Sequence, residues 1–245
     1  MKNYFAKFYD CKKNKLNKKI NWFFSLIKSN YFIIFLERKD NVFLPLYIEN
    51  NIMLGLQFET ETSWVAVAKD GLEQLMIDHA FAEQKAAANA MSITINYSEE
   101  TALVRDMMDI AIEEMEHFKM VHELMIARGM VLGQATKNDY ALRLQKFFTK
   151  THNRNEALVQ RLLVAALIEA RSCERFKVFA DNMEDEELCK FYHELMVSEA
   201  NHYTLFLAYA RKYMNKEIVD EKWNALLAFE AEMMKSRGNS AKIHG

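Results

Sequence analysis

The chain has 245 residues, of which 51% are apolar, and its formal net charge is −2. This length and apolar content suffice for one large domain or two small ones, and the charge does not point to a nucleic-acid-binding surface. The three cysteines form no CxxC pair, which excludes an even disulfide framework and fits a reducing cytoplasm.

Residues 1–52 differ in composition from the rest. They carry ten Lys and Arg against four Asp and Glu, a charge of +6, which leaves −8 for residues 53–245. The apolar run Ile20–Leu36 is interrupted by polar residues, so we expect no membrane span, and no small-residue cleavage site follows it. We expect residues 1–52 to be an atypical, dispensable extension, translated upstream of a start at Met53. A peripheral membrane anchor is the alternative.

Residues 53–245 are expected to form one helical domain. The only proline is Pro45, and glycine is rare, so little interrupts long helices. Apolar residues recur with helical spacing from Ser63 onward. The pattern predicts helices at Ser63–Met91 with a break near Gly71, from the cap Ser98 to Arg128 before Gly129, and at Asn155–Ala180, Glu184–Met214 and Val219–Arg237, with a short helix at Tyr140–Phe148.

The loop lengths predict how these helices are arranged. Short links join the first long helix to the second and the third to the fourth, whereas about 25 residues, 129–154, separate the second from the third. Two antiparallel pairs joined by one long crossover are typical of ferritin-like bundles. We therefore expect an all-α, ferritin-like four-helix bundle with an additional C-terminal helix.

Two segments repeat the pattern Glu-x-x-His followed by an aromatic residue, at Glu114–Phe118 and Glu199–Tyr203. Residues three apart share a helix face, so each pair can direct both side chains at one point. Both pairs lie on the apolar stripes of their helices, whereas Glu113 and Glu116 lie off the stripe and are expected to be solvated. One such pair is more often a buried polar network, but two pairs at matching positions indicate a metal site.

The first helix of each pair offers one further carboxylate on its apolar stripe. Glu83 precedes Glu114 by 31 residues, and Glu169 precedes Glu199 by 30. Burial of four carboxylates without cations would cost several kcal/mol for each, and two divalent cations would neutralise them. Four Glu and two His are typical of di-iron or di-manganese carboxylate proteins and unlike a structural zinc site. The expected ligands are Glu83, Glu114, His117, Glu169, Glu199 and His202.

Three more residues are candidates for holding these ligands in place. His79 lies one turn before Glu83 and is either a partner of that carboxylate or a core histidine. Asp78 is a candidate acceptor for a ligand histidine. Glu174 is the rival of Glu169 and is expected in a salt bridge or around the ligands. The remaining histidines, which include His244, are expected at the surface.

Four segments carry a resemblance to a known family. They are Asp78–Ala87, Glu113–Phe118, Ile168–Phe176 and Ser198–Tyr203, of which Ile-Glu-Ala-Arg-Ser-Cys-Glu-Arg-Phe at residues 168–176 is the most specific. They resemble the tRNA hydroxylases of the MiaE family, over about residues 54–245. Residues 1–52 have no counterpart in that resemblance.

The resemblance implies a tRNA-modifying di-iron monooxygenase in the cytoplasm. Such enzymes hydroxylate the isopentenyl group of 2-methylthio-N(6)-isopentenyladenosine beside the tRNA anticodon, and they use O2 and two external electrons. The sequence contains no flavin or nicotinamide motif, so a separate reductase or ferredoxin is the expected electron donor. We expect a monomer or dimer that binds tRNA and does not bind a membrane.

The crossover contains the candidate RNA-binding residues. Basic side chains alternate there with the aromatic residues Tyr140, Phe147 and Phe148, a combination that suits phosphate contact and base stacking. An ordinary solvated loop explains the pattern equally well. The candidates are Arg143, Lys146, Lys150 and Arg154.

Two other functions remain open from the sequence. A ferritin-like iron store or protective protein would require a large symmetric shell. A di-iron hydroxylase of another substrate, such as a quinone, would favour an interfacial helix in residues 1–52, whose pattern argues against one. A rubrerythrin-like peroxidase would carry CxxC pairs, which the sequence lacks.

Overall fold

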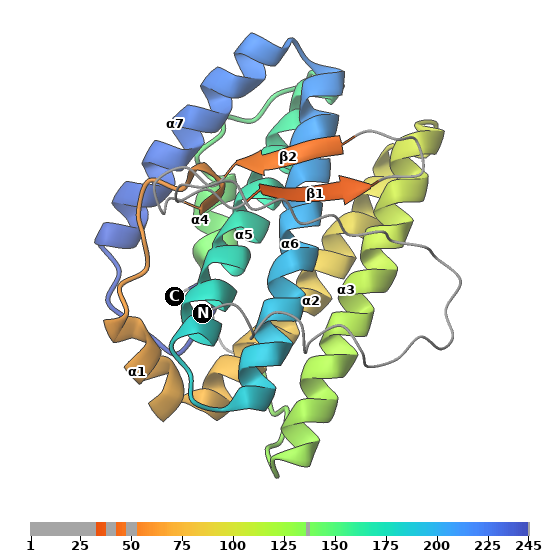
Figure 1. Cartoon of the computed structure of the whole chain (residues 1–245). Coiled ribbons are helices and arrows are strands. Elements are labelled where there is room, and N and C mark those ends of the chain that lie inside the picture. The colour runs from red at the N-terminus through yellow and green to blue at the C-terminus, as the bar shows by residue number, and fades with distance from the viewer. Residues whose placement is uncertain (1–32, 38–42, 48–52, 136–137, 245) are drawn as a thin grey trace. The chain divides into compact units, whose positions relative to one another are not determined.

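The structure is a computed structural model that describes residues 33–37, 43–47, 53–135 and 138–244 (Figure 1). The chain divides into two units, Met1–Asn51 and Ile52–Gly245. Most of the run Ile20–Leu36 lies outside the described residues.

The first unit contains the antiparallel hairpin of β1 (Ile33–Glu37) and β2 (Phe43–Tyr47), with Phe35 opposite Pro45. The sequence does not predict this hairpin, because both strands are nearly continuous apolar runs without the alternation of a half-buried strand.

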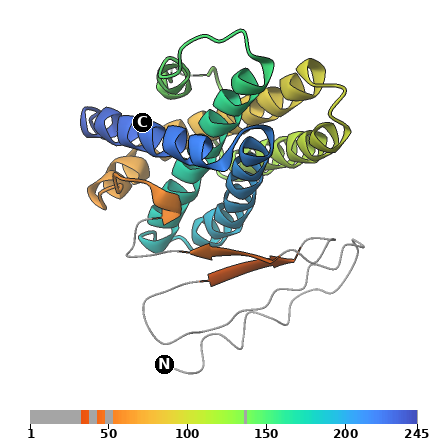
Figure 2. The same cartoon turned by 90° about the horizontal axis from the view of Figure 1, so that it is seen from above.

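Every regular element that the structure describes in the second unit is a helix. Its four long helices form two pairs, α2 with α3 and α5 with α6, and the long crossover carries the short helix α4 (Figures 1 and 2). This arrangement is the expected ferritin-like bundle. The elements are η1 (Met53–Gly55), α1 (Ser63–Asp70), α2 (Leu72–Asn96), α3 (Thr101–Ala127), α4 (Tyr140–Gln145), α5 (Arg154–Asp181), α6 (Glu186–Tyr213) and α7 (Lys216–Lys235).

The helix ends follow local chemistry. The predicted break near Gly71 is confirmed, and Gly129 follows α3 with a φ of +70°, a conformation that glycine adopts without strain. The prediction that Ser98 caps α3 is wrong, because the turn after α2 extends to Glu100 and α3 begins at Thr101. A side-chain cap is present on α5, where the side chain of Asn153 accepts a hydrogen bond from the backbone N–H of Glu156.

A buried cluster at one end of the bundle joins α1, α2, α3, α5 and α6. Trp64 packs edge-on against Phe179, and Tyr192 contacts Phe176 and Phe179. Apolar burial of this kind contributes most of the stability of a fold, at about 25 cal/mol for each Å². None of the helices that the structure describes is both long enough and apolar enough to cross a bilayer.

We predict that a chain starting at Met53 folds and hydroxylates like the full-length chain. The two units have separate sets of internal contacts, and every residue of the predicted metal site lies in the second. Thermal melts and turnover of the two forms test this prediction. A loss of folding or of activity on truncation would show that residues 1–52 contribute to the enzyme.

Candidate metal centre

The six predicted ligands converge inside the bundle. Each of α2 and α5 contributes one glutamate, and each of α3 and α6 contributes one Glu-x-x-His pair. All six side chains are buried, between 0 and 6% exposed. They are Glu83, Glu114, His117, Glu169, Glu199 and His202.

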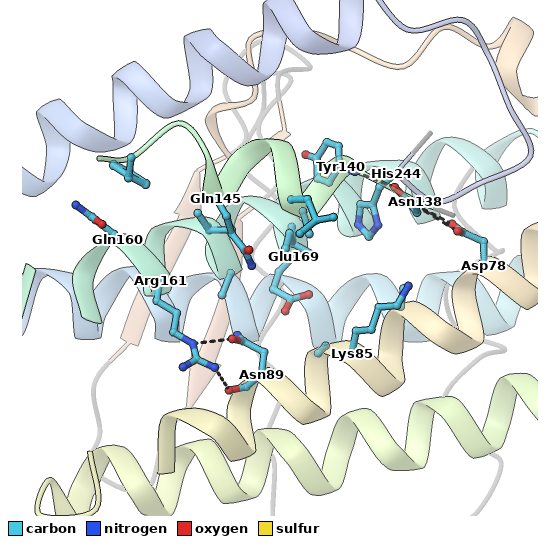
Figure 3. Close-up of a pocket in the computed structure, with 18 of the residues that line it drawn as sticks. Asp78, Lys85, Asn89, Asn138, Tyr140, Gln145, Gln160, Arg161, Glu169 and His244 are labelled. Atoms are coloured by element: carbon cyan, nitrogen blue, oxygen red, sulfur yellow. Dashed lines mark hydrogen bonds between the residues drawn. The ribbon is translucent and has the colours of Figure 1, made fainter. Parts of the chain in front are cut away.

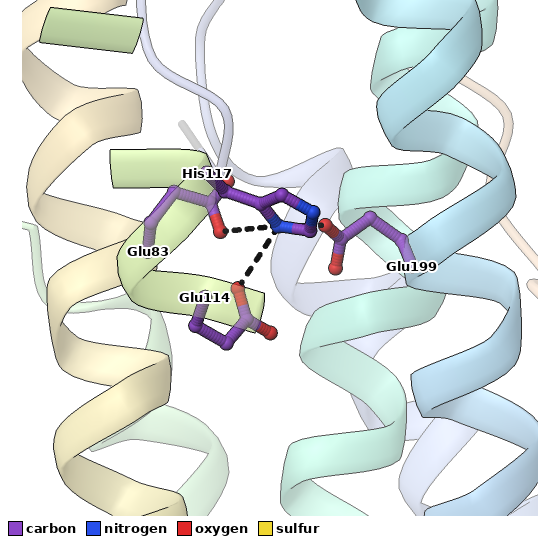
Figure 4. A group of neighbouring side chains, drawn as sticks. All are labelled: Glu83, Glu114, His117 and Glu199. Atoms are coloured by element: carbon purple, nitrogen blue, oxygen red, sulfur yellow. Dashed lines mark ion pairs between the residues drawn. The ribbon is translucent and has the colours of Figure 1, made fainter. Parts of the chain in front are cut away.

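The donor atoms form two overlapping groups. The first contains Glu83 and His117, and the second contains Glu169 and His202; both groups include Glu114 and Glu199, and the atoms of each lie within 4.8 Å of one another. Figure 4 shows the first group, with the imidazole of His117 between the carboxylates. Two shared carboxylates between two otherwise separate groups are the arrangement expected for a bridged pair of metal ions.

The imidazoles direct the same nitrogen at the carboxylates. Nδ1 of His117 lies 3.4 Å from Glu114 Oε2 and 3.6 Å from both Glu83 Oε2 and Glu199 Oε1. Nδ1 of His202 lies 2.9 Å from Glu114 Oε1 and 3.8 Å from Glu199 Oε2. A metal ion bound between such groups would be held through these two nitrogens and the carboxylate oxygens that face them.

Several of these donor atoms lack the hydrogen bonds that burial normally requires. Both carboxylate oxygens of Glu114, Oε1 of Glu199 and Nδ1 of His117 and His202 are buried, and they make no hydrogen bond within the described part of the chain. Buried polar atoms are otherwise nearly always hydrogen-bonded. Four carboxylates and two imidazole nitrogens with unused lone pairs fit two divalent cations.

The electrostatics of the metal-free site lead to the same conclusion. Burial by itself lowers the pKa of His117, but the carboxylates of Glu114, Glu83 and Glu199 raise it to about 11. Burial and repulsion from Glu199 and Glu114 raise the pKa of Glu169 well above its usual range. Protons therefore compensate the carboxylates when metal is absent, and metal binding displaces them.

Two side chains fix ligand orientations. His79 Nε2 lies 2.6 Å from Glu83 Oε1, the contact expected under the first of the two alternatives for this residue, and its ring packs on Phe176 and Tyr192. Glu113 accepts hydrogen bonds from His202 Nε2 at 3.2 Å and from Ser198 Oγ at 2.7 Å. Contacts of this kind fix the ring orientation of a metal-binding histidine.

The interpretation of Glu113 as a merely solvated residue is therefore corrected. Burial raises the pKa of its carboxyl, but the bonds to His202 and Ser198 outweigh this effect and lower the pKa to about 2. The side chain is 49% exposed, so it connects the surface to a histidine of the site. The helix pattern of α3 gave no signal for it, because both partners lie on α6.

The two other candidate supports have partners other than the six donors. Among the described residues, Asp78 contacts Asn138 Nδ2 and the backbone N–H of Ile243 rather than a ligand histidine. Glu174 accepts two hydrogen bonds from Thr60 and forms a 3.0 Å ion pair with Arg171. The salt bridge expected for Glu174 is present, but these contacts place it in a buried network away from the six donors.

The crossover candidates differ from one another. Arg154 is engaged by Glu99 Oε1 at 2.6 Å and by the carbonyl of Asn96, and it lies over the ring of Tyr97. Its guanidinium is therefore already paired with a carboxylate, and its expected role in phosphate contact stays a prediction. Arg143 is half-buried in α4. Lys146 and Lys150 are exposed, and neither forms an ion pair with any described residue.

A cavity of about 650 Å³ lies beside the candidate metal centre, between α2, α4 and α5. Figure 3 shows that Glu169 extends into its middle, with Arg161 and His244 on opposite sides. Ala82, Ala86 and Ala165 leave room near this carboxylate. Ligand pockets usually measure about 300–1,000 Å³, so this one has the size of a small-molecule site. His244 was expected at the surface, but it is 5% exposed and lines this pocket.

The bundle, the two Glu-x-x-His pairs and the two additional glutamates define the class of ferritin-like carboxylate proteins with a dinuclear metal site. A family model described as tRNA-(MS[2]IO[6]A)-hydroxylase (MiaE) matches residues 48–245, and the chain belongs to this family.

Three known proteins are similar to the chain. A tRNA 2-(methylsulfanyl)-N(6)-isopentenyladenosine(37) hydroxylase of Pseudomonas putida is 36% identical over 76% of this chain and 89% of its own length. The protein of the same description from Salmonella typhimurium is 36% identical over 54% of this chain and 47% of its own length. A solved structure, protein 43 with aldehyde deformylating oxygenase activity from Synechococcus, has a TM-score of 0.72 and 31% identity. The match covers 78% of this chain and 95% of the chain in the solved structure.

Proposed function

We propose that the chain is a di-iron monooxygenase that hydroxylates the isopentenyl group of 2-methylthio-N(6)-isopentenyladenosine next to the tRNA anticodon. The observation that carries this proposal is the double position of Glu169, which belongs to the cluster of donors and also lines the pocket. A substrate group in the pocket would thus lie beside the metals. Membership of the MiaE family supports the choice of substrate.

The six buried donors would hold two iron ions, which supply the activation of O2. Overall, one oxygen atom enters a C–H bond of the prenyl group, and the other leaves as water with two electrons and two protons. The electrons come from a separate reductase or ferredoxin. The chain would ligate the metals and exclude water. His79 and Glu113 would hold the ligand side chains in position.

The pocket offers both polar and apolar side chains to a prenylated purine. Asn89, Gln160 and Arg161 lie at one end, and Arg161 donates hydrogen bonds to the side-chain and backbone oxygens of Asn89 at 2.8 and 2.9 Å. Near Glu169 the lining combines alanine and branched aliphatic side chains with Lys85 and Gln145 (Figure 3). The base would occupy the polar end and the prenyl group the apolar part, which requires that the nucleotide leave its stack in the anticodon loop.

The proposal also extends to the partners and location of the enzyme. A tRNA substrate favours a cytoplasmic enzyme, and a monomer or dimer leaves the pocket and the crossover open to RNA. Size-exclusion chromatography with light scattering separates this state from the large shell of an iron store. A shell-sized assembly would favour the storage function.

The test of this function is hydroxylation of prenylated tRNA by the iron-loaded protein with an electron donor, followed by mass spectrometry of the nucleosides. In the same assay, Lys146→Ala/Lys150→Ala should raise the KM for tRNA by about tenfold at low salt and leave the iron content unchanged. Each lost phosphate contact weakens binding and lowers its salt dependence. A prenylated free nucleoside lacks the phosphates, so its turnover should stay constant.

The matched control replaces two exposed lysines outside the crossover, Lys190 and Lys235, by alanine. This variant should bind tRNA like the unmodified enzyme. Equal losses on tRNA and nucleoside would assign Lys146 and Lys150 to folding or chemistry. No hydroxylation of either substrate by the iron-loaded, reduced protein would refute the proposed function.

A further inference from the structure

The C-terminal tail forms the buried end of the pocket. The backbone N–H of Ile243 donates to Asp78 Oδ2 at 3.0 Å, and the His244 ring lies 2.9 Å from Ser172 Oγ through Nε2. The same ring stacks on Tyr140 with the centroids 5.0 Å apart and the planes at 17°. His244 is thus held by α5 on one edge and by α4 on its face, and it lines the cavity.

The order of residues along α5 gives the pocket a direction. Arg161, Glu169 and Ser172 follow one another on this helix, which rises 1.5 Å for each residue, so Glu169 lies about 12 Å beyond Arg161 and about 4.5 Å before Ser172. The facing helix α2 runs the other way and repeats the order, since Asn89 contacts Arg161 and Asp78 contacts the tail. Figure 3 shows Arg161 and His244 on opposite sides of Glu169.

We propose that His244 is the end wall of this pocket and limits the length of the prenyl chain that the enzyme accepts. This inference rests on the proposed function. A purine at the polar end beside Arg161 extends its N(6) substituent toward Glu169, and only about one helical turn remains before His244. That space suits the terminal methyl groups of a five-carbon chain, and a second isoprene unit would collide with the wall.

The His244 ring is held in place and uncharged, although Asp78, Lys85 and Asn138 line the same pocket. Burial, together with the nearby guanidinium groups of Arg175 and Arg171, lowers the pKa of His244 to about 3, so its ring is neutral. The stack on Tyr140 is itself fixed, because the Tyr140 hydroxyl donates to Glu230 Oε1 at 2.9 Å. A neutral, immobile ring rejects a longer chain by steric contact and can remain in contact with a hydrocarbon without a large desolvation cost.

The test compares hydroxylation of adenosine nucleosides that carry a five-carbon or a ten-carbon N(6)-prenyl chain by the iron-loaded, full-length enzyme. His244→Ala should raise the ratio of kcat/KM for the ten-carbon over the five-carbon substrate by at least about tenfold, which is the discrimination that a single misfit methylene provides. His244→Phe keeps a flat ring of similar size and should preserve the ratio.

Ile243→Ala is the matched control, because Ile243 is a buried tail residue that does not line the cavity. It should lower the melting temperature and leave the chain-length ratio unchanged. His244→Trp supplies an independent measurement, even if His244→Ala fails to fold. The larger ring should reduce kcat/KM for the five-carbon chain by more than for a three-carbon allyl chain.

Binding of the same nucleosides to the metal-loaded protein, measured by calorimetry, gives the comparison without turnover. An unchanged ratio in folded His244→Ala, or equal losses for both chains in His244→Trp, would overturn the proposal. If the unmodified enzyme binds the five-carbon nucleoside in preference to the ten-carbon one but hydroxylates neither, the length limit stands and the proposed reaction is refuted.

Discussion

A His117→Ala/His202→Ala double variant should retain almost no iron after anaerobic loading and should not hydroxylate, whereas the unmodified protein should bind about two iron ions. The two imidazoles are the only nitrogen donors in the two groups of candidate ligands that the described residues form. Their loss leaves each group with carboxylates alone and opens a space for water. Because the metal carries the oxidation chemistry, activity should disappear with it. Metal analysis and the hydroxylation assay measure both effects.

The control for this experiment is His152→Ala/His193→Ala, which removes two exposed histidines outside the candidate centre. It should load iron and turn over normally. Circular dichroism of the first double variant must confirm that the bundle is still folded. Full iron loading in folded His117→Ala/His202→Ala protein would show that the metals are held elsewhere, and no iron in the unmodified protein would refute the dinuclear site.

The fold and the convergence of the six residues can be predicted from the sequence, because they depend on residue spacing within helices and on loop lengths. Both Glu-x-x-His pairs place two donors on one helix face, and the 31- and 30-residue separations from Glu83 and Glu169 equal one helix hairpin each. The loop lengths then determine which helices are neighbours. The structure accordingly brings together all six predicted side chains.

The supporting residues were harder to predict, because each depends on a contact with a distant segment. Glu113 lies on the solvated side of α3 by its own helical pattern, and only the packing of α6 brings His202 and Ser198 to it. Asp78 turns away from the ligands because the tail and crossover offer it donors. His244 follows a glycine- and serine-containing segment, which in the sequence resembles a frayed terminus.

The crossover shows the same limit. Arg154 is a basic residue of the kind that contacts phosphate. In the structure it pairs with the carboxylate of Glu99 and donates to the backbone carbonyl of Asn96 at the end of α2, and no local sequence pattern predicts these contacts. Lys146 and Lys150 keep their side chains in solvent. The sequence therefore identifies the segment that is rich in basic residues, and the three-dimensional arrangement determines which of these charges remain exposed and unpaired among the described residues.

Arg171→Met should lower the free energy of unfolding by about 3–5 kcal/mol, the usual cost of breaking a buried ion pair by removing one partner. Arg171 is fully buried and donates to both carboxylate oxygens of Glu230, to Glu174 and to the carbonyl of Phe58. Its removal leaves two buried carboxylates with fewer donors. Urea unfolding of the metal-free protein measures the loss without a contribution from metal binding.

Two further variants separate this charge effect from other causes. Lys119→Ala breaks the ion pair of Lys119 with Glu123, in which the two side chains are 71% and 63% exposed respectively. It should change the free energy of unfolding by less than about 0.5 kcal/mol. Arg171→Met/Glu230→Leu removes both charges of the principal pair and should recover part of the loss, because apolar replacements of a buried pair are often neutral. A loss of the same size in the double variant would mean that shape and packing, rather than an uncompensated charge, account for the role of Arg171.

The network joins α5 to α7 and, through Tyr140, to the wall of the pocket. Arg171→Met should therefore also loosen the ring stack on His244.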